Sequence, residues 1–344
     1  MRTGCRADVP AARAIPIPPS LAVALALAAL CGALACGGEA PDSAVAEDPL
    51  EAEAIASAGT AHPMPLDDGA QPAARRGGHL SYYGGRVLSR AEVVAVFWGD
   101  AVPAAVKDGA GPFYEAALSS SYVDWLSEYD TTVDAVDGSR GTGQPIGRGV
   151  FKGAVTIHPR TKAKTLTDAA IRRELTAQIS AGKLPRPGSE TLYMIHFPKG
   201  VHIALGGSRS CSSGGFCAYH NSFRRAGKEI DYGVLPDLGP GTGCDTGCGH
   251  GATVFDNQTS VASHELIEAI TDPQVGLGKG LAAPLAWYDA QGGEIGDLCN
   301  AQQGRLRATS GRVYAVQKEW SNAAGGCILS RRAGSGALAE IDAD

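Results

Sequence analysis

The stretch VVAVFWG, residues 93–99, is an apolar, β-branched and aromatic run that ends in glycine, and this pattern predicts a buried β-strand. Segment 189–198 has the same character, and segment 149–159 alternates like a pair of strands. Between these strands, segments 112–129 and 166–182 have helical periodicity. Because strands alternate with helices, we predict a single α/β domain, or an α+β domain, with a mixed sheet.

The helix expected at 166–182 has signals at both ends. Thr167 is placed to cap its first turn, Asp168 follows in that turn, and Gly182 marks its end. Residues 205–257 are rich in glycine, hold four cysteines and have little periodicity. We therefore expect a long loop region tied by disulfides, of the kind in which functional residues are often found.

The first 36 residues are predicted to be a bacterial export signal. A basic start precedes the apolar run LAVALALAALCGALAC (21–36), and small residues before Cys36 resemble a lipoprotein cleavage box, with Ala33 in place of leucine. We expect lipidation at Cys36 as the sole contact with a membrane, in an outer-membrane lipoprotein. The alternatives are a secreted protein with an ordinary signal peptide, or a membrane anchor. The basic residues are Arg2, Arg6 and Arg13.

Composition divides the rest of the chain into three parts. Residues 37–77 carry eight acidic side chains, two basic ones and no aromatic residue, so they are predicted to be a disordered acidic tether. Residues 78–330 have the length and composition of one globular domain, and 331–344 are predicted to be a flexible tail. The net charge of −6, without a basic stripe, argues against a nucleic-acid partner.

Six cysteines follow the predicted signal, and an even number in an exported protein predicts disulfide bonds. Six cysteines allow about 15 pairings, and we expect neighbours in the sequence to pair. The rival hypothesis is a zinc knuckle formed by Cys244 and Cys248 with His250. A redox role is disfavoured, because the chain has no C-x-x-C pair. The expected bonds are Cys211–Cys217, Cys244–Cys248 and Cys299–Cys327.

The segment SHELIEAITDP, residues 263–273, begins like the H-E-x-x-H helix of zinc peptidases (zincins), but Glu268 replaces the second histidine. On a helix, His264 and Glu268 are i, i+4 neighbours whose side chains can converge on one metal ion. Glu265 lies at the flank, where the general base of a zinc peptidase stands. The rival interpretation is an ordinary solvated helix face. Three apolar side chains form an arc expected to face the core: Leu266, Ile267 and Ile270.

A third ligand is expected from AWYDAQGGEIGDLCN, residues 286–300, because zinc peptidases take one from beyond the helix. Glu294 is the favoured ligand and Asp297 the alternative. If this part is helical, the two carboxylates share a face, and the one that does not bind metal can accept the outer ring N–H of His264. The rival interpretation is that Glu294 and Asp297 cap a loop or bind structural calcium.

Four segments occur together in this chain: GGRVLSRAEVVAVFWG (84–99), SHELIEAITDP (263–273), the Trp-Tyr pair 287–288 and GEIGDLC (293–299). Together they resemble the Exordium-like family, also called phosphate-induced proteins, over most of residues 80–328. The resemblance implies an extracytoplasmic protein, linked in plants to cell expansion and growth, with no settled enzymatic activity. Plant members commonly have Asn at the position of Asp272, so Asp272 is not expected to be a necessary ligand.

The resemblance also points to FCAYH, residues 216–220, which is similar to a cysteine and histidine cluster of that family. His220 is therefore a second candidate for the site. The alternative is a structural histidine beside a disulfide.

Two functions follow from these residues. The first is an exported metal-dependent hydrolase, a zinc peptidase with a zincin-like helix, in which His264, Glu268 and Glu294 hold the ion. Glu265 would act as the general base, and His220 would stabilise the oxyanion. The substrate would be a protein, a peptide or a cell-wall glycan.

The alternative is a non-enzymatic cell-envelope protein that binds glycan or protein and keeps a structural or vestigial metal site. Trp287 and Tyr288, if exposed, could then form a sugar platform, although core packing is the expectation for at least one of them.

The ligand types limit the chemistry of the ion. One imidazole and two carboxylates leave a divalent ion without net charge, so a bound water would have a pKa above the ~7 typical of catalytic zinc. The oxygen-rich set admits Mn²⁺ or Fe²⁺ as well as zinc. We expect one divalent ion, and slow or alkaline-shifted hydrolysis.

Overall fold

The stretch VVAVFWG lies mostly in β3 (Glu92–Trp98), inside a six-stranded sheet. The computed structural model describes residues 63–67, 78–331 and 340–342, all within the unit Glu47–Asp344. Strands β4, β3, β6 and β10 run parallel to one another. Strand β9 is antiparallel to β10, and β1 is antiparallel to β9, so the predicted mixed sheet is confirmed. The order is β1 (Met64–Pro65), β9 (Phe216–Arg225), β10 (Lys228–Leu235), β6 (Thr191–His196), β3 and β4 (Val150–Ile157).

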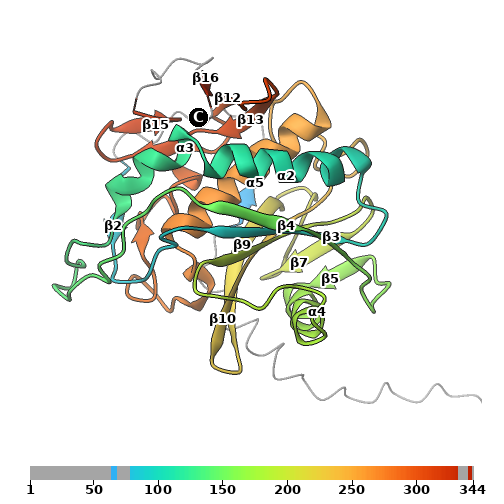
Figure 1. Ribbon diagram of the computed structural model, residues 1–344, viewed down its shortest axis with the longest axis horizontal. Helices are drawn as coiled ribbons and strands as arrows, with labels where there is room; N and C mark the ends of the chain where they lie inside the picture. Colours follow the sequence, from blue (N-terminus) through green and yellow to red (C-terminus); the bar gives the residue numbers. More distant parts are fainter. Residues whose placement is uncertain (1–62, 68–77, 332–339, 343–344) are drawn as a thin grey trace, which may run out of the picture. The chain divides into compact units, whose positions relative to one another are not determined.

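Helices cover both faces of this sheet (Figure 1). Helices α2 and α5 pack on one face, with α3 and the 3-10 turn η1 following α2, and α4 packs on the other. Each face has its own apolar core: Phe113 and Leu266 belong to the first, Ile171 and Leu175 to the second. The bounds are α2 (Ala104–Leu118), α3 (Ser121–Asp124), η1 (Trp125–Tyr129), α4 (Asp168–Ser180) and α5 (Val254–Thr271).

Smaller sheets surround this framework. They pair β11 with β2, β12 with β13 and β16, β14 with β15, and β7 with β5 and β8. The bounds are β2 (Ser81–Tyr82), β5 (Thr165–Thr167), β7 (His202–Leu205), β8 (Ser208–Arg209), β11 (Trp287–Tyr288), β12 (Gln303–Arg307), β13 (Val313–Gln317), β14 (Glu319–Ser321), β15 (Gly326–Ile328) and β16 (Glu340–Asp342); two further 3-10 turns are η2 (Val275–Leu277) and η3 (Asp297–Cys299).

Helix α5 begins at a capping box. The Thr253 hydroxyl accepts a hydrogen bond from the backbone of Asp256, whose carboxylate accepts one from the backbone of Thr253. The helix ends at Thr271, before Pro273. It lies between β9 and β10 on one side and β13 on the other, and every residue from Gln258 onward is buried. The interpretation of its polar side as a solvated face is therefore wrong: His220 of β9 and the loop before η3 lie against it, with Gln317 of β13 beside His264.

The other expected elements are largely present. Helix α4 has Thr167 as its N-cap, accepting from the Ala170 backbone, and Gly182 follows its end with a positive φ of 68°. Segment 149–159 forms one strand, not two, and the helix expected at 112–129 begins earlier, at Ala104. Segment 205–257 is not one long loop, because it contains β9 and β10, two central strands of the sheet.

The described residues contain three disulfides, and two differ from the expected pairs. Cys299–Cys327 is confirmed. The other two bonds are Cys211–Cys244 and Cys217–Cys248, which tie the start of β9 to the loop before α5. Neighbours in the sequence do not pair, because β9 and β10 carry the chain out and back between them. The zinc knuckle is wrong as well, since both of its cysteines are bonded to other cysteines.

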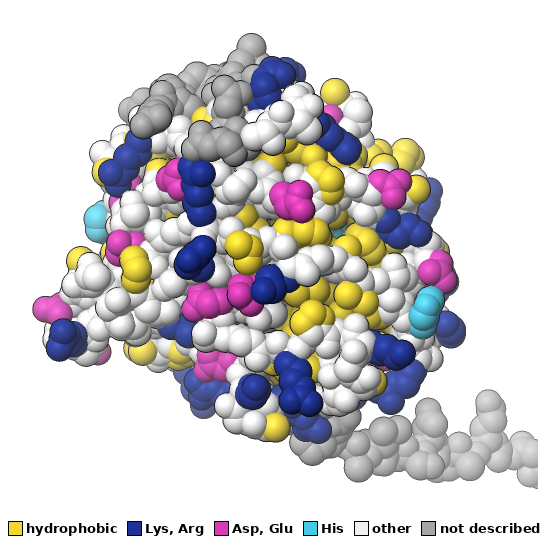
Figure 2. Space-filling model, viewed as in Figure 1, with side chains coloured by type: hydrophobic (Ala, Val, Ile, Leu, Met, Phe, Trp, Pro, Cys, Tyr) yellow, Lys and Arg dark blue, Asp and Glu magenta, His cyan; other side chains and the backbone are white. Residues whose placement is uncertain are grey.

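The disulfides are typical of an oxidising, extracytoplasmic compartment. No helix in the described part of the chain has the length and apolar character to span a membrane. The predicted signal and Cys36 lie outside the described residues. Strands β1 and β16 fall in the segments that the sequence assigns to the tether and the tail. On the face seen in Figure 2, basic and acidic side chains are interspersed, with hydrophobic side chains between them.

Candidate metal centre

Three parts of the fold bring six ionisable side chains together in the interior, and we call this set the α5 cluster. Helix α5 supplies three, β9 one, and the loop that ends in η3 two. Five of them are buried, four of these without accessible surface, and Asp297 is partly buried. The members are His264, Glu265 and Glu268 from α5, His220 from β9, and Glu294 and Asp297 from the loop.

The geometry depends on two glycines. Gly233 of β10 pairs with His220 of β9, and a Cβ on Gly233 would meet the Met194 sulfur at 2.7 Å and lie 3.9 Å from Glu265. Gly296 lies against α5, where a Cβ would meet His264 Nδ1 at 2.6 Å and a Glu268 carboxylate oxygen at 2.8 Å. The loop approaches the helix this closely only because Gly296 carries no side chain, whereas Gly233 leaves room for Met194 of β6 beside the cluster.

The first group of ligand atoms joins His264, Glu268 and Asp297. His264 Nε2 lies 3.1 Å from Glu268 Oε1 and 3.9 Å from Asp297 Oδ1. The backbone N–H of Asp297 donates to Glu268 Oε1 at 3.1 Å, which holds the loop against the helix. All three residues offer ligand atoms within 4.8 Å of one another, so they can hold one metal ion.

The second group joins His220, Glu265 and Glu268, again within 4.8 Å. His220 Nδ1 lies 3.4 Å from Glu265 Oε2 and 3.5 Å from Glu268 Oε2. On the other side of the ring, His220 Nε2 lies 3.1 Å from the backbone carbonyl of Asp272 and 3.4 Å from Glu294 Oε1. Glu268 therefore belongs to both groups.

Much of the hydrogen-bonding capacity of these residues is unused. Burial of a charged or polar group without a partner costs several kcal/mol unless a proton or a cation compensates it. Within the described residues, these buried atoms of the cluster have no hydrogen-bond partner: His220 Nδ1, His264 Nε2, Glu265 Oε1 and Oε2, Glu268 Oε2, and Glu294 Oε1 and Oε2.

Without a cation, the cluster shares protons unevenly. Burial alone would lower the pKa of His264, but the carboxylates of Glu268, Glu265 and Asp297 together raise it to about 10. Burial would raise the pKa of Glu268, but His264 and His220 lower it to about 2. Burial raises the pKa of Glu294 and Asp297 well above the usual range. Among these side chains, the negative charge of the carboxylates can therefore be compensated only by bound protons.

Sequence reasoning missed the residues behind His264. Its Nδ1 lies 2.8 Å from the side-chain nitrogen of Gln317, which also donates to the Gly296 carbonyl at 2.9 Å. Glu319 lies beyond Gln317, and Tyr122 donates to both the Gln317 carbonyl and the Glu319 carboxylate. An ion on His264 Nε2 needs a proton on Nδ1, and Gln317 would then turn its oxygen, which has no partner within the described residues, toward that proton.

The expected ligands are therefore brought together only in part. His264 and Glu268 converge as predicted, and Asp297 rather than Glu294 lies beside them. The reason is that Glu294 precedes η3 and is not helical, so the two carboxylates do not share a helix face. Glu294 faces His220, which the family resemblance had raised as a candidate.

The Asp297 carboxylate also accepts the Glu294 backbone N–H at 2.9 Å, as the loop-capping alternative describes. The exposed sugar platform is wrong: Trp287 and Tyr288 are 8% and 6% exposed and pack in the core.

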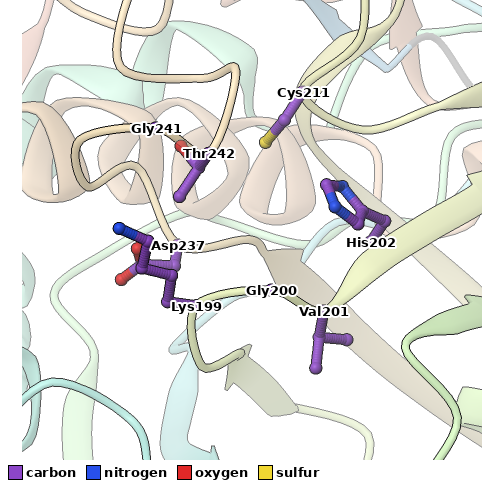
Figure 3. A pocket seen from close by; sticks show the side chains of 8 residues that line it. All are labelled: Lys199, Gly200, Val201, His202, Cys211, Asp237, Gly241 and Thr242. Carbon is purple, nitrogen blue, oxygen red and sulfur yellow. The ribbon is translucent and has the colours of Figure 1, made fainter.

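Two pockets among the described residues have linings that do not include a member of the α5 cluster. One, of about 50 Å³, lies between Lys199 and Asp237 on one side and His202 and Cys211 on the other (Figure 3). A larger hollow of about 780 Å³ includes Gln274 in its lining, two residues beyond Asp272. Since the Asp272 carbonyl contacts His220, this hollow marks the side from which a ligand could approach the cluster.

Comparisons of the chain with family models, with curated proteins and with solved structures found no match.

Proposed function

We propose that this chain is an exported metal-dependent hydrolase that cleaves peptide bonds, with its centre in the α5 cluster. The observation that carries the proposal is Glu265. Its carboxylate is fully buried, neither oxygen has a hydrogen-bond partner within the described residues, and it belongs to the second group of metal-ligand atoms, which shares Glu268 with the first. A charged group kept in this state is typical of an active site rather than of a structural one.

In the proposed site, His264, Glu268 and Asp297 hold a divalent ion, which would polarise the scissile carbonyl and acidify a water molecule. Zinc is the first candidate, and the oxygen-rich ligands also suit Mn²⁺ or Fe²⁺. Glu265 takes a proton from the attacking water and passes it to the leaving amine. Protonated His220, across from Glu265, is placed to stabilise the oxyanion.

A second candidate is a non-enzymatic envelope protein of Exordium type that binds glycan or protein and uses the ion for stability. The burial of the centre favours it: His264, Glu265, Glu268 and Glu294 have no accessible surface, as in closed structural metal sites. Hydrolysis therefore requires that the segment after α5 move to admit substrate.

The hydrolase is tested with the purified mature protein and a peptide library. We expect peptide cleavage that stops when a chelator is added and resumes with Zn²⁺ or Mn²⁺. The substitution Glu265→Gln should lower the cleavage rate by at least about 100-fold. Glu174→Gln, a buried carboxylate on α4, is the matched control and should keep full activity.

Cleavage that survives both the chelator and Glu265→Gln would contradict the hydrolase. A stoichiometric ion that stabilises the fold, without any cleavage, would instead identify the envelope protein.

The proposed location is the cell envelope, through export and lipidation at Cys36, with secretion as the alternative. We expect Cys36→Ala, or globomycin treatment, to leave unprocessed precursor in the membrane fraction. Normal maturation of Cys36→Ala would favour the secreted form.

A further inference from the structure

The two groups of ligand atoms in the α5 cluster meet at one carboxylate and use opposite sides of it. Glu268 Oε1 faces His264 Nε2, whereas Glu268 Oε2 faces His220 Nδ1. A carboxylate that presents one oxygen to each of two ligand groups is the arrangement of a bridging ligand, as in two-metal sites with ions about 3.5–4 Å apart.

The proton on His220 is placed by its surroundings. Nε2 lies 3.1 Å from the Asp272 carbonyl, which can only accept a hydrogen bond, so Nε2 carries the proton. In the neutral ring, Nδ1 then presents a lone pair to the carboxylates of Glu265 and Glu268. A ring N–H bonded to a backbone carbonyl, with the other nitrogen facing carboxylates, is the usual setting of a metal-binding histidine.

The distances distinguish an ion from an ion pair. A protonated His220 would donate to a glutamate at about 2.7–2.9 Å. The observed separations are 3.4 Å to Glu265 and 3.5 Å to Glu268. Ligands bound tetrahedrally at about 2.1 Å are about 3.4 Å apart, so His220 Nδ1 lies at ligand spacing from each of the two carboxylate oxygens.

The charge balance of the α5 cluster also favours a second ion. The α5 cluster has four carboxylates and two imidazoles, and none of its own members carries a permanent positive charge. With neutral imidazoles and all four carboxylates ionised, one divalent ion leaves a formal charge of −2 and two ions leave none, before the buried carboxylate of Asp272 beside the cluster is counted. Uncompensated charge in the interior is strongly unfavourable.

From these observations we infer that the α5 cluster is a binuclear centre, in which Glu268 bridges two divalent ions. The first ion is held with His264 and Asp297, as in the proposed function on which this inference rests. The second is held by His220 Nδ1 and Glu265. This changes two roles of the proposed function, because Glu265 and His220 are then ligands and not the general base and the oxyanion donor. Glu294, whose two oxygens are buried without a hydrogen-bond partner within the described residues, becomes the proton acceptor.

The test uses Mn²⁺ alone as the probe on the metal-free mature protein. We expect the wild type to bind two equivalents in a titration followed by elemental analysis. Glu265→Gln and His220→Ala should each bind one equivalent, and so should His264→Ala. His196→Gln is the matched control, since His196 is an equally buried histidine that bonds Tyr114, and it should bind two.

Electron paramagnetic resonance of the wild type needs no variant and therefore does not depend on how a variant folds. Two Mn²⁺ ions that share a carboxylate couple magnetically, so the six-line spectrum of isolated Mn²⁺ should be replaced by a coupled spectrum at two equivalents. In Glu265→Gln, the isolated spectrum should return at one equivalent.

Saturation of the wild type at one equivalent overturns the second ion and leaves the proposed function standing. So does a Glu265→Gln protein that binds as many ions as the wild type. Two equivalents with uncoupled spectra overturn the bridge. No binding at all overturns both the binuclear centre and the proposed function.

Discussion

Two neighbouring residues of β9, Tyr219 and His220, point to opposite faces of the sheet and enter two different buried charged clusters. His220 enters the α5 cluster. Tyr219 enters a set under α4 that we call the tyrosine cluster: Asp168, Arg172, Tyr219 and Tyr232.

The tyrosine cluster neutralises its own charge. Arg172 lies 2.7 Å from Asp168 and donates to the Tyr232 hydroxyl at 2.8 Å. Asp168 accepts from Tyr219 at 2.7 Å and from Tyr232 at 2.5 Å. The charge of Asp168 is balanced by that of Arg172, and two hydroxyls donate to its other oxygen, so no cation has to come from solution.

The α5 cluster is equally buried but has no such cation among its members. Its imidazoles are the only groups that can become positive, and the contacts that His220 makes with Glu265 and Glu268 are too long for strong hydrogen bonds. The difference shows that burial of charge alone does not mark a functional site. What marks it is a buried charge that the chain itself leaves uncompensated.

The largest effect is expected from removal of the cation of the tyrosine cluster. Arg172→Met leaves Asp168 buried without its partner, which should lower the free energy of unfolding by about 3–5 kcal/mol in denaturant titrations. Metal content should not change. The double variant Asp168→Asn/Arg172→Met should recover much of the loss. If Arg172→Met costs less than about 1 kcal/mol, the cluster does not hold charge as described.

Metal removal should act on the α5 cluster alone. At free metal about 100 times the dissociation constant, a bound ion stabilises the fold by about 2.7 kcal/mol, and a chelator should remove this contribution. Thermal unfolding with and without the chelator measures it, and added Zn²⁺ should reverse the change. Asp168→Asn/Arg172→Met should respond to the chelator as the wild type does. If the chelator does not change the melting temperature of the wild type, the contrast between the α5 cluster and the tyrosine cluster is contradicted.

His196 is a third buried group, and it is kept neutral. Burial lowers the pKa of His196 to about 3, below the ~6.5 of an unfolded chain, and its Nε2 lies 3.1 Å from the Tyr114 hydroxyl. Below pH 6.5 the unfolded chain binds a proton at His196 that the folded protein does not bind. The free energy of unfolding therefore decreases as the pH decreases. His196 should lower the free energy of unfolding by about 2 kcal/mol when the pH drops from 7 to 5. Denaturant titrations of the wild type should show this extra loss relative to His196→Gln.

The smallest effect concerns Gln317, which orients His264. Gln317→Leu removes the amide beside His264 Nδ1 and should weaken metal binding at least about tenfold, or about 1.4 kcal/mol. Gln303→Leu is the matched control, because Gln303 also bonds to α5, through Ser260, without contact to a ligand. Equal metal affinities of the two variants would show that Gln317 has no orienting role.

Local patterns were sufficient where an element is defined by its own residues. Thr167 and Gly182 mark the ends of α4, and the apolar run of β3 predicts a central strand. The i, i+4 spacing of His264 and Glu268 places both side chains at one point, because helical geometry is the same in the sequence as in the fold.

Contacts between distant segments were not predictable. Strand β9 is buried on both faces, yet His220 and its polar neighbours interrupt the apolar pattern that would have revealed it. The disulfides from Cys211 and Cys217 depend on the hairpin that β9 and β10 form. Gln317 contacts His264 from a strand some 50 residues away, and no spacing rule connects them.

The most direct test of the central claim is anomalous diffraction from crystals of the mature protein grown with Zn²⁺. The account predicts anomalous density beside Glu268, at about 2.1 Å from ring nitrogens of His264 and His220. The contradictory result is the absence of such density, with His220 drawn to about 2.8 Å from Glu265 or Glu268 as a protonated ion pair.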